Sequence, residues 1–312
     1  MTTETMAQVS GLIGRDELMD NIRKELKKGK HVLLCGEIGI GKSVVMTQAL
    51  SHLPGNKTII DIQDHQTKGQ FVELAKQLFY LNLVALADLD LPSIYADTAV
   101  SEIPWDKIKR RVNRNSIRDL ASAVIPALKR GGGNLIIAVD DMSFLTPTQQ
   151  AFWLTVLEHA QVIGCASEKK KGVQKLWWKM KHFDVPRLKA CDMKQIVENY
   201  VDAKGILIES RNLFISHVVK TSAGVPAAAF DMLHDSSMER VVSKRHVREM
   251  SHSAGLKYAS FSPFLLAGGA CVVGLRYIAI GLGDTSLYIM AGMSAALFLA
   301  LRFTLFKGNN AT

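Results

Sequence analysis

The stretch GEIGIGKS, residues 36–43, constrains the fold of this chain more than any other feature of its sequence. Gly36 and Gly41 are separated by four residues and followed directly by Lys42 and Ser43. Glycines at this spacing let a loop wrap phosphate groups with its backbone N–H groups when a strand precedes it and a helix follows it. The run HVLLC before the loop reads as a buried strand, and SVVMTQALSHL after it reads as a helix. We therefore predict that residues 36–43 form a phosphate-binding loop, here called the phosphate loop.

The same spacing predicts the chemistry of the loop. Lys42 is expected to reach the β- and γ-phosphates of a nucleotide, and the Ser43 hydroxyl is expected to ligate magnesium. The expected ligands are therefore ATP and Mg²⁺. The residues expected to contact the nucleotide along the loop and the start of the helix are Gly36, Glu37, Ile38, Gly39, Ile40, Gly41, Lys42, Ser43 and Val44.

Further apolar strand patterns at residues 57–62, 134–139 and 161–167 alternate with helical patterns. This alternation is typical of an α/β fold with a mainly parallel sheet covered by helices on both faces. After about residue 188 the strand patterns stop and helical patterns continue, which predicts a small helical lid domain. We expect an ATPase core at 1–187, the lid at 188–258, and an apolar tail at 259–312.

An acidic pair, Asp140 and Asp141, follows the apolar strand pattern LIIAV. A phosphate loop of this kind requires an acid at the end of a buried strand to hold the magnesium shell. Asp140 is the expected magnesium partner. Asp141 is expected to orient or deprotonate the attacking water, with capping of the next turn as the alternative.

Four stretches together, GLIGRDELMDNI, GEIGIGKS, LIIAVDD and SAGVPAAA, resemble the AAA+ and STAND NTPases. The resemblance is strongest to the branch of origin-recognition initiators, archaeal-type ATPases and transposon target-selection ATPases, and it spans roughly residues 11–250. It implies a P-loop NTPase fold and an oligomer whose sites are completed by a neighbour's arginine. It also implies that two further segments contact the nucleotide. Ile13, Gly14 and Arg15 are implied to lie near its base, and Gly224, Val225 and Pro226 are implied to contact it from the lid.

The chain departs from this family pattern at several positions. Asp141 stands where AAA+ members usually have Glu, and no Arg or Lys follows Pro226. Cys165 occupies the expected place of a polar sensor, with Ser167 as a substitute. Arg187 is the candidate arginine supplied to a neighbouring subunit, the alternative being a solvated arginine at a domain edge. Nucleotide binding is therefore better supported than fast hydrolysis.

The tail contains two apolar runs, at 262–280 and 286–306, each close to the ~20 residues that a transmembrane helix needs. Only one charge lies within each run, Arg276 and Arg302, and each is near an end. We expect a two-helix transmembrane hairpin whose ATPase domain faces the cytoplasm, with a bacterial inner membrane as the expected bilayer. A buried helical hairpin of a soluble core is the alternative.

The chain is basic, with a formal net charge of +9, which favours nucleic acid or an anionic membrane surface as a partner. Two clusters carry much of this charge, and solvated helix faces are the alternative interpretation. They consist of Lys107, Lys109, Arg110, Arg111, Arg114 and Arg118, and of Lys169, Lys170, Lys171, Lys175, Lys179 and Lys181 around Trp177 and Trp178. The four cysteines have no metal-binding spacing.

Three functional hypotheses follow from these observations. The first is a membrane-anchored AAA+/STAND-like ATPase that uses its nucleotide state to switch or remodel a protein partner at the cytoplasmic membrane face. The second is an ATP-dependent DNA-binding protein of replication, transposition or plasmid and phage function, tethered to the membrane. The third is a scaffold in which the nucleotide is only a structural ligand.

Overall fold

The structure is a computed structural model, and it forms two compact units, Met1–Gly255 and Leu256–Thr312. The residues that the structure describes are 13–53, 55, 57–64, 66–84, 103–167, 171–239, 241–249, 262–283, 285–286 and 288–296.

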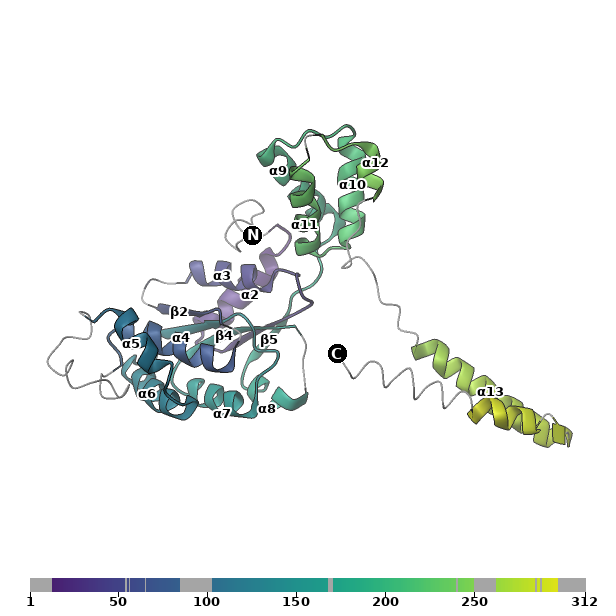
Figure 1. Ribbon diagram of the computed structural model, residues 1–312, viewed down its shortest axis with the longest axis horizontal. Coiled ribbons are helices and arrows are strands. Elements are labelled where there is room, and N and C mark those ends of the chain that lie inside the picture. The colour runs from purple at the N-terminus through teal and green to yellow at the C-terminus, as the bar shows by residue number, and fades with distance from the viewer. Residues whose placement is uncertain are drawn as a thin grey trace. The chain divides into compact units, whose positions relative to one another are not determined.

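A five-stranded sheet with strand order β2-β3-β4-β1-β5 forms the centre of the first unit. Figure 1 shows this sheet between helices on its two sides. All its neighbouring strands are parallel, and Leu34 of β1 lies opposite Cys165 of β4 and Phe183 of β5. The predicted parallel sheet is thus confirmed. Its strands are β1 (Val32–Cys35), β2 (Thr58–Ile62), β3 (Leu135–Val139), β4 (Gln161–Ala166) and β5 (Lys181–Asp184).

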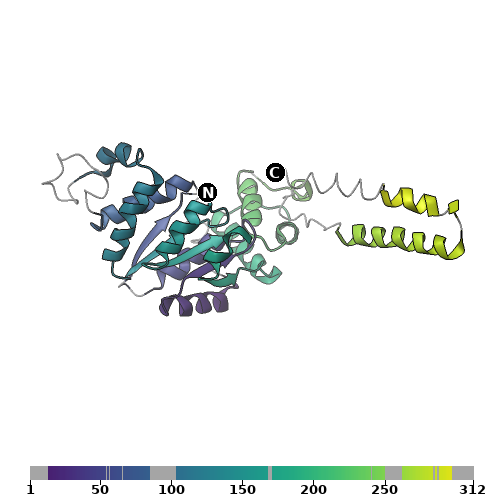
Figure 2. The same cartoon turned by 90° about the horizontal axis from the view of Figure 1, so that it is seen from below.

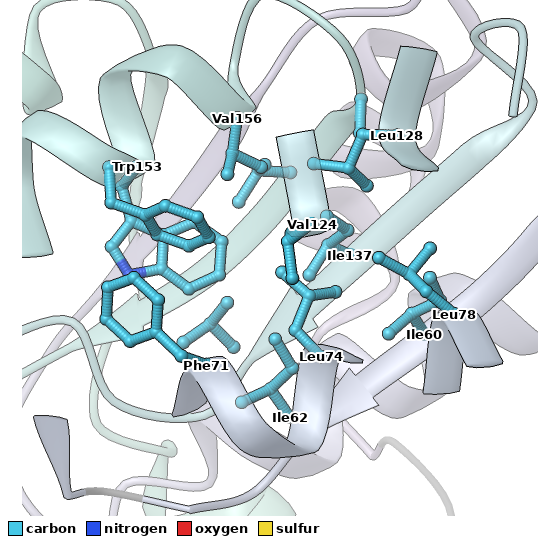
Figure 3. Packing of buried hydrophobic residues seen from close by; sticks show 14 of the residues in the cluster. Ile60, Ile62, Phe71, Leu74, Leu78, Val124, Leu128, Ile137, Trp153 and Val156 are labelled. Atoms are coloured by element: carbon cyan, nitrogen blue, oxygen red, sulfur yellow. The ribbon is translucent and has the colours of Figure 1, made fainter. Parts of the chain in front are cut away.

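Helices cover both faces of the sheet because successive strand residues point to opposite sides. On one face, Val32 and Leu34 pack with α2 (Asp16–Lys27) and α3 (Lys42–Ser51). On the other face, Leu33 and Cys35 join a larger apolar core, part of which Figure 3 shows around Phe71, Leu74 and Trp153. The helices that supply this second core are α4 (Thr67–Tyr80), α5 (Trp105–Val112), α6 (Ile117–Arg130), α7 (Pro147–Val156) and α8 (Gln174–Trp177).

The short helix α8 and the strand β5 were not expected from the sequence. The short strand β5 has the sequence KHFD, and its residues are exposed or only half-buried because it lies at the edge of the sheet. Helix α5 contains four cations of the first basic cluster, all exposed, while its apolar residues Trp105, Ile108 and Val112 are buried. This arrangement agrees with the solvated helix face given as the alternative interpretation of that cluster.

Within the described residues 188–239 and 241–249, the lid contains four helices with a core of their own. Tyr200 and Phe230 meet edge to face in this core, with ring centroids 5.8 Å apart. The helices are α9 (Ala190–Lys204), α10 (Arg211–Ser222), α11 (Pro226–Ser237) and α12 (Lys244–Glu249). Ala223 and Gly224 join α10 to α11 in left-handed conformations, with φ of 49° and 83°.

The second unit contains α13 (Ser262–Leu282), and residues 288–296 are also helical. The two helical stretches run alongside each other in Figure 2. The small residues Ala279 and Ala291 are buried, whereas Tyr277 and Ile278 are exposed. In the part of the chain that the structure describes, no helix combines the length and apolarity needed to cross a membrane. The expected transmembrane hairpin is therefore not confirmed, and residues 297–306 of its second run lie outside the described residues.

Candidate nucleotide-binding site

The phosphate loop connects the end of β1 to the start of α3, as the sequence predicts. Gly39 and Gly41 have φ of 76° and 92°, conformations that only glycine adopts without strain. Gly41 is the N-cap of α3. The first N–H groups of a helix have no acceptor within the helix, and they carry the positive end of its dipole. The loop therefore directs N–H groups and a favourable dipole toward an anion at this position.

Lys42 lies across the loop. Its Nζ donates hydrogen bonds to the carbonyl oxygens of Gly36 and Glu37, each at 2.9 Å. Burial lowers the pKa of Lys42, because the charged ammonium loses water contacts there. A bound phosphate can replace these neutral carbonyl acceptors with charged ones, which make stronger hydrogen bonds to an ammonium group.

Ser43 and Asp140 meet across 97 residues of sequence. The Ser43 hydroxyl donates a short hydrogen bond to Asp140 Oδ1, directly after the end of β3. Both side chains offer oxygen, the ligand atom that Mg²⁺ prefers. Among the described residues, no group of three or more His, Cys, Asp or Glu side chains is placed to hold a metal ion. The two oxygens of Ser43 and Asp140 fit Mg²⁺, which typically takes one or two protein oxygens and completes its shell with water and phosphate.

Asp141 caps the turn that follows β3. Its Oδ1 accepts a hydrogen bond from the backbone N–H of Ser143 at 2.8 Å. Capping is the alternative interpretation of this residue, and its role toward water stays a prediction. Ser143, which sequence reasoning missed, is buried, and its Oγ accepts the backbone N–H of Ser167 at 2.8 Å. This bond ties the ends of β3 and β4 together beside the site.

Cys165 is fully buried under α3, and its Sγ contacts Met46 Sδ at 3.9 Å. Burial raises the pKa of its thiol, so the group is neutral. This environment makes Cys165 a packing residue in the described structure. Ser167 takes part through its backbone N–H.

A buried network of polar side chains contacts the backbone of the acidic pair. Gln70 Oε1 accepts hydrogen bonds from Gln149 Nε2 at 3.1 Å and from Trp153 Nε1 at 3.3 Å. Gln70 Nε2 donates to the backbone carbonyl of Asp141 at 3.5 Å. Gln149 also forms a capping box with Thr146 at the start of α7. The capping box can be read from the sequence, whereas the long-range role of Gln70 cannot.

Arg15 lies beneath the phosphate loop, with only 6 % of its surface exposed. Its Nη2 donates to the carbonyl oxygen of Ile40 at 2.5 Å, and its Nη1 lies 3.5 Å from that of Gly41. Burial lowers the pKa of Arg15 to about 10. In this structure the guanidinium braces the loop. Its implied role near the nucleotide base stays a prediction.

Two neighbours of Arg15 contact the lid. Ile13 packs against the core of the lid, and a Cβ on Gly14 would come within 2.3 Å of Asp192 Oδ2. Gly14 has a φ of 78°. The Gly-Arg segment therefore lies between the phosphate loop and α9.

The Gly224-Val225-Pro226 turn lies at the phosphate loop. The backbone N–H of Ala227, in the first turn of α11, donates to the carbonyl oxygen of Gly39 at 3.1 Å. Gly224 accepts a hydrogen bond from the N–H of Leu188 at 2.9 Å. The structure thus brings the first turn of α11, directly after Gly224-Val225-Pro226, against the phosphate loop. The implied contact of this turn with a nucleotide stays a prediction.

Arg187 contacts the phosphate loop of its own chain. Its Nε and Nη2 donate to Glu37 Oε2 at 3.0 and 2.6 Å, and its Nη1 donates to the carbonyl oxygen of Ala223 at 3.3 Å. It is therefore more than a solvated arginine at a domain edge. The prediction that Arg187 is supplied to the site of a neighbouring subunit stays a prediction.

Ile38, at the tip of the loop, is 82 % exposed.

None of the site contacts described above involves a described residue of the two basic clusters. All six cations of the first cluster are exposed on α5 and the residues after it. In the second cluster Trp177 is buried, Trp178 is 79 % exposed, and Lys179 pairs with Glu158 at 3.6 Å. Lys169 and Lys170 lie outside the described residues.

Comparison with known proteins gives likenesses among solved structures but no match by sequence. No protein-family model matches the chain, and no curated protein matches it. Among solved structures, the chain is similar to a Walker-type ATPase of Pyrococcus abyssi, with 13 % sequence identity and a TM-score of 0.47. The match covers 86 % of this chain and 80 % of that chain. The functional assignment therefore rests on the residues of the chain itself.

Proposed function

We propose that the chain is a magnesium-dependent ATPase whose helical lid follows the nucleotide state. The observation that carries this proposal is the hydrogen bond between Ser43 and Asp140, formed beside Lys42 at the start of α3. This hydrogen bond joins the two residues that the sequence predicts as magnesium ligands, one from the phosphate loop and one from the acidic pair. The backbone N–H groups of the loop complete a site for a nucleotide phosphate chain.

Each group has a distinct part in this activity. The loop N–H groups bind the phosphates, and Lys42 exchanges its carbonyl partners for phosphate oxygens. Ser43 and Asp140 hold Mg²⁺, which when bound neutralises phosphate charge. Asp141 uses Oδ1 as a cap, and its carboxylate orients a water or accepts its proton. Arg15 fixes the shape of the loop from below.

The test is nucleotide binding and turnover by the full-length protein in detergent. We expect Lys42→Ala to weaken ATP binding at least tenfold, because hydrogen bonds to charged groups contribute about 1.5–3 kcal/mol each. Lys57→Ala is the matched control, since Lys57 also donates to a loop carbonyl, that of Gly133 at 3.2 Å. Unchanged ATP affinity in Lys42→Ala would reject the site. Tight binding without turnover would instead select the scaffold hypothesis.

We further propose that the second unit attaches the ATPase to a lipid bilayer, so that the lid acts on a protein partner at the cytoplasmic face. The exposed apolar side chains of this unit support membrane attachment, including Leu275, Tyr277, Ile278, Ile280 and Ile289. Flotation with phospholipid vesicles measures it. The full chain should float and a chain ending at Gly255 should not, and equal flotation of both would reject attachment through this unit.

A second candidate function is ATP-dependent DNA binding, and the exposed cations of α5 favour it. Phosphate contacts by such cations make binding strongly dependent on salt. Duplex DNA titrated at low and moderate salt, with and without ATP, tests this candidate. Replacement of Lys109 and Arg110 by Ala should weaken binding, and absence of binding at low salt would remove the candidate.

A further inference from the structure

An ion pair joins the phosphate loop to the segment that leads into the lid. Two donors of the Arg187 guanidinium, Nε and Nη2, converge on the single oxygen Oε2 of Glu37. The remaining nitrogen, Nη1, donates to the carbonyl oxygen of Ala223, in the turn between α10 and α11. One side chain therefore contacts both the loop and the lid turn.

The backbone around Arg187 is held in place on both sides. Val185 donates its N–H to the carbonyl of Cys35 at 2.7 Å, directly before the loop. Leu188 donates its N–H to Gly224 at 2.9 Å, and a Cβ on Gly224 would lie only 2.6 Å from the Leu188 carbonyl oxygen. The Arg187 side chain, by contrast, is 34 % exposed. A change of partner at this position is therefore a movement of the side chain.

Glu37 contacts two of the cations that border the loop, Lys42 and Arg187. Its backbone carbonyl accepts from Lys42 Nζ, and its carboxylate accepts from Arg187. The carboxylate carries one negative charge and is more than half exposed. A nucleotide triphosphate in the loop would place its terminal phosphate near Lys42, with more negative charge than Glu37 offers. Charge-assisted hydrogen bonds from a guanidinium fork to phosphate are among the strong ones.

We propose that Arg187 reads the terminal phosphate of a nucleotide bound to its own chain, and that Glu37 holds the guanidinium when this phosphate is absent. This inference rests on the proposed nucleotide site. The γ-phosphate of ATP competes with Glu37 for the guanidinium, whereas ADP lacks this group and leaves the ion pair intact. Because the same guanidinium contacts Ala223, its movement changes a contact of the lid turn.

The test compares the affinities of the full-length protein for ADP and for a non-hydrolysable ATP analogue, both with Mg²⁺, by calorimetry. Arg187→Ala should weaken binding of the analogue about tenfold, the loss expected for a charge-assisted hydrogen bond, and change ADP binding less than twofold. Arg187→Lys should restore part of the preference, because it keeps the charge without the fork. Glu37→Gln should raise the preference for the analogue, because it removes the competing carboxylate.

Arg211→Ala is the matched control, because Arg211 forms a similar pair with Asp202 at 2.6 Å on the lid, and it should leave both affinities unchanged. The preference is the ratio of the affinity for the ATP analogue to the affinity for ADP. Because both affinities are measured on the same variant, partial unfolding does not alter their ratio. If Arg187→Ala weakened binding of ADP and of the ATP analogue equally, the inference would be overturned. A lower preference for the ATP analogue over ADP in Glu37→Gln would also overturn it. In either case, nucleotide binding that depends on Lys42 would still support the proposed function. Absence of any nucleotide binding by the unmodified protein would overturn both.

Discussion

The backbone N–H of Ala227 donates a hydrogen bond to the carbonyl oxygen of Gly39 at 3.1 Å, so the first turn of α11 rests on the tip of the phosphate loop. The approach is close, since a Cβ on Gly39 would lie 2.8 Å from that of Ala227. Gly39 therefore serves two purposes. It adopts a left-handed conformation, and it leaves room for the lid.

Replacing Gly39 by Ala should weaken nucleotide binding several-fold, because the added methyl group pushes α11 off the loop. Gly29 provides a matched control, since it has the same φ of 76° but has no atom within 4 Å of an added Cβ. Both variants should lose about 1–2 kcal/mol of unfolding free energy through backbone strain. Thermal unfolding and nucleotide titration separate the two effects. Equal nucleotide affinities in Gly39→Ala and Gly29→Ala would show that the lid contact does not matter for binding.

Asp140 and Asp141 should respond differently to replacement by Asn. Asp140→Asn removes the charge beside Ser43, so ATP binding should require a much higher Mg²⁺ concentration, while binding without Mg²⁺ changes little. The measurement is a Mg²⁺ titration of ATP affinity. An unchanged Mg²⁺ requirement in Asp140→Asn would contradict its assignment as a metal ligand.

Asp141→Asn keeps an oxygen that can accept the N–H of Ser143, so the turn after β3 should persist. Mg²⁺-dependent affinity should therefore be retained. Steady-state turnover should fall about 10²–10⁴-fold if the carboxylate acts on water as we propose. Turnover equal to that of the unmodified protein would leave Asp141 with a capping role alone.

Replacing Arg15 by Ala should destabilise the protein before any nucleotide is added. The carbonyl oxygen of Ile40 would lose its buried donor, which costs about 1–3 kcal/mol, or several degrees in Tm for a unit of this size. Arg23→Ala is a control, because Arg23 pairs with the exposed carboxylate of Asp20 at 3.5 Å, and such a pair is worth at most about 1 kcal/mol. Weaker nucleotide binding with an unchanged Tm would instead indicate direct contact between Arg15 and the nucleotide base.

The meeting of Ser43 and Asp140 was predictable from sequence for a geometric reason. Each follows an apolar strand, β1 or β3, and the carboxyl ends of parallel strands lie at one edge of a sheet. Helix α2 was readable from its apolar periodicity because it buries one stripe against the sheet, and α3 was readable from its place directly after the phosphate loop.

The remaining features depend on tertiary context that local pattern does not contain. Strand β5 is short and polar, and only its place beside β1 makes it a strand. Glu37 and Arg187 are separated by 150 residues, and each belongs to a loop whose path is set by other contacts. The buried Gln70 shows no charge or spacing that marks it as the support of Asp141. In each case, the structural role depends on which residue lies next to it in the fold, and the residue type alone does not reveal that neighbour.

His31 should make stability depend on pH. The backbone N–H of Val162 donates to His31 Nδ1 at 3.2 Å, which requires this nitrogen to be unprotonated. Burial, aided by the charge of Lys179, lowers the pKa of His31 below its ordinary value of 6.5. The unfolded chain then takes up the proton first as pH falls, so stability is complete above pH 6.5 and declines below it. His31→Asn offers an oxygen acceptor that does not titrate. Urea unfolding between pH 5 and 8 should show the unmodified protein losing stability relative to His31→Asn toward acid pH, whereas parallel pH profiles would contradict this role for His31.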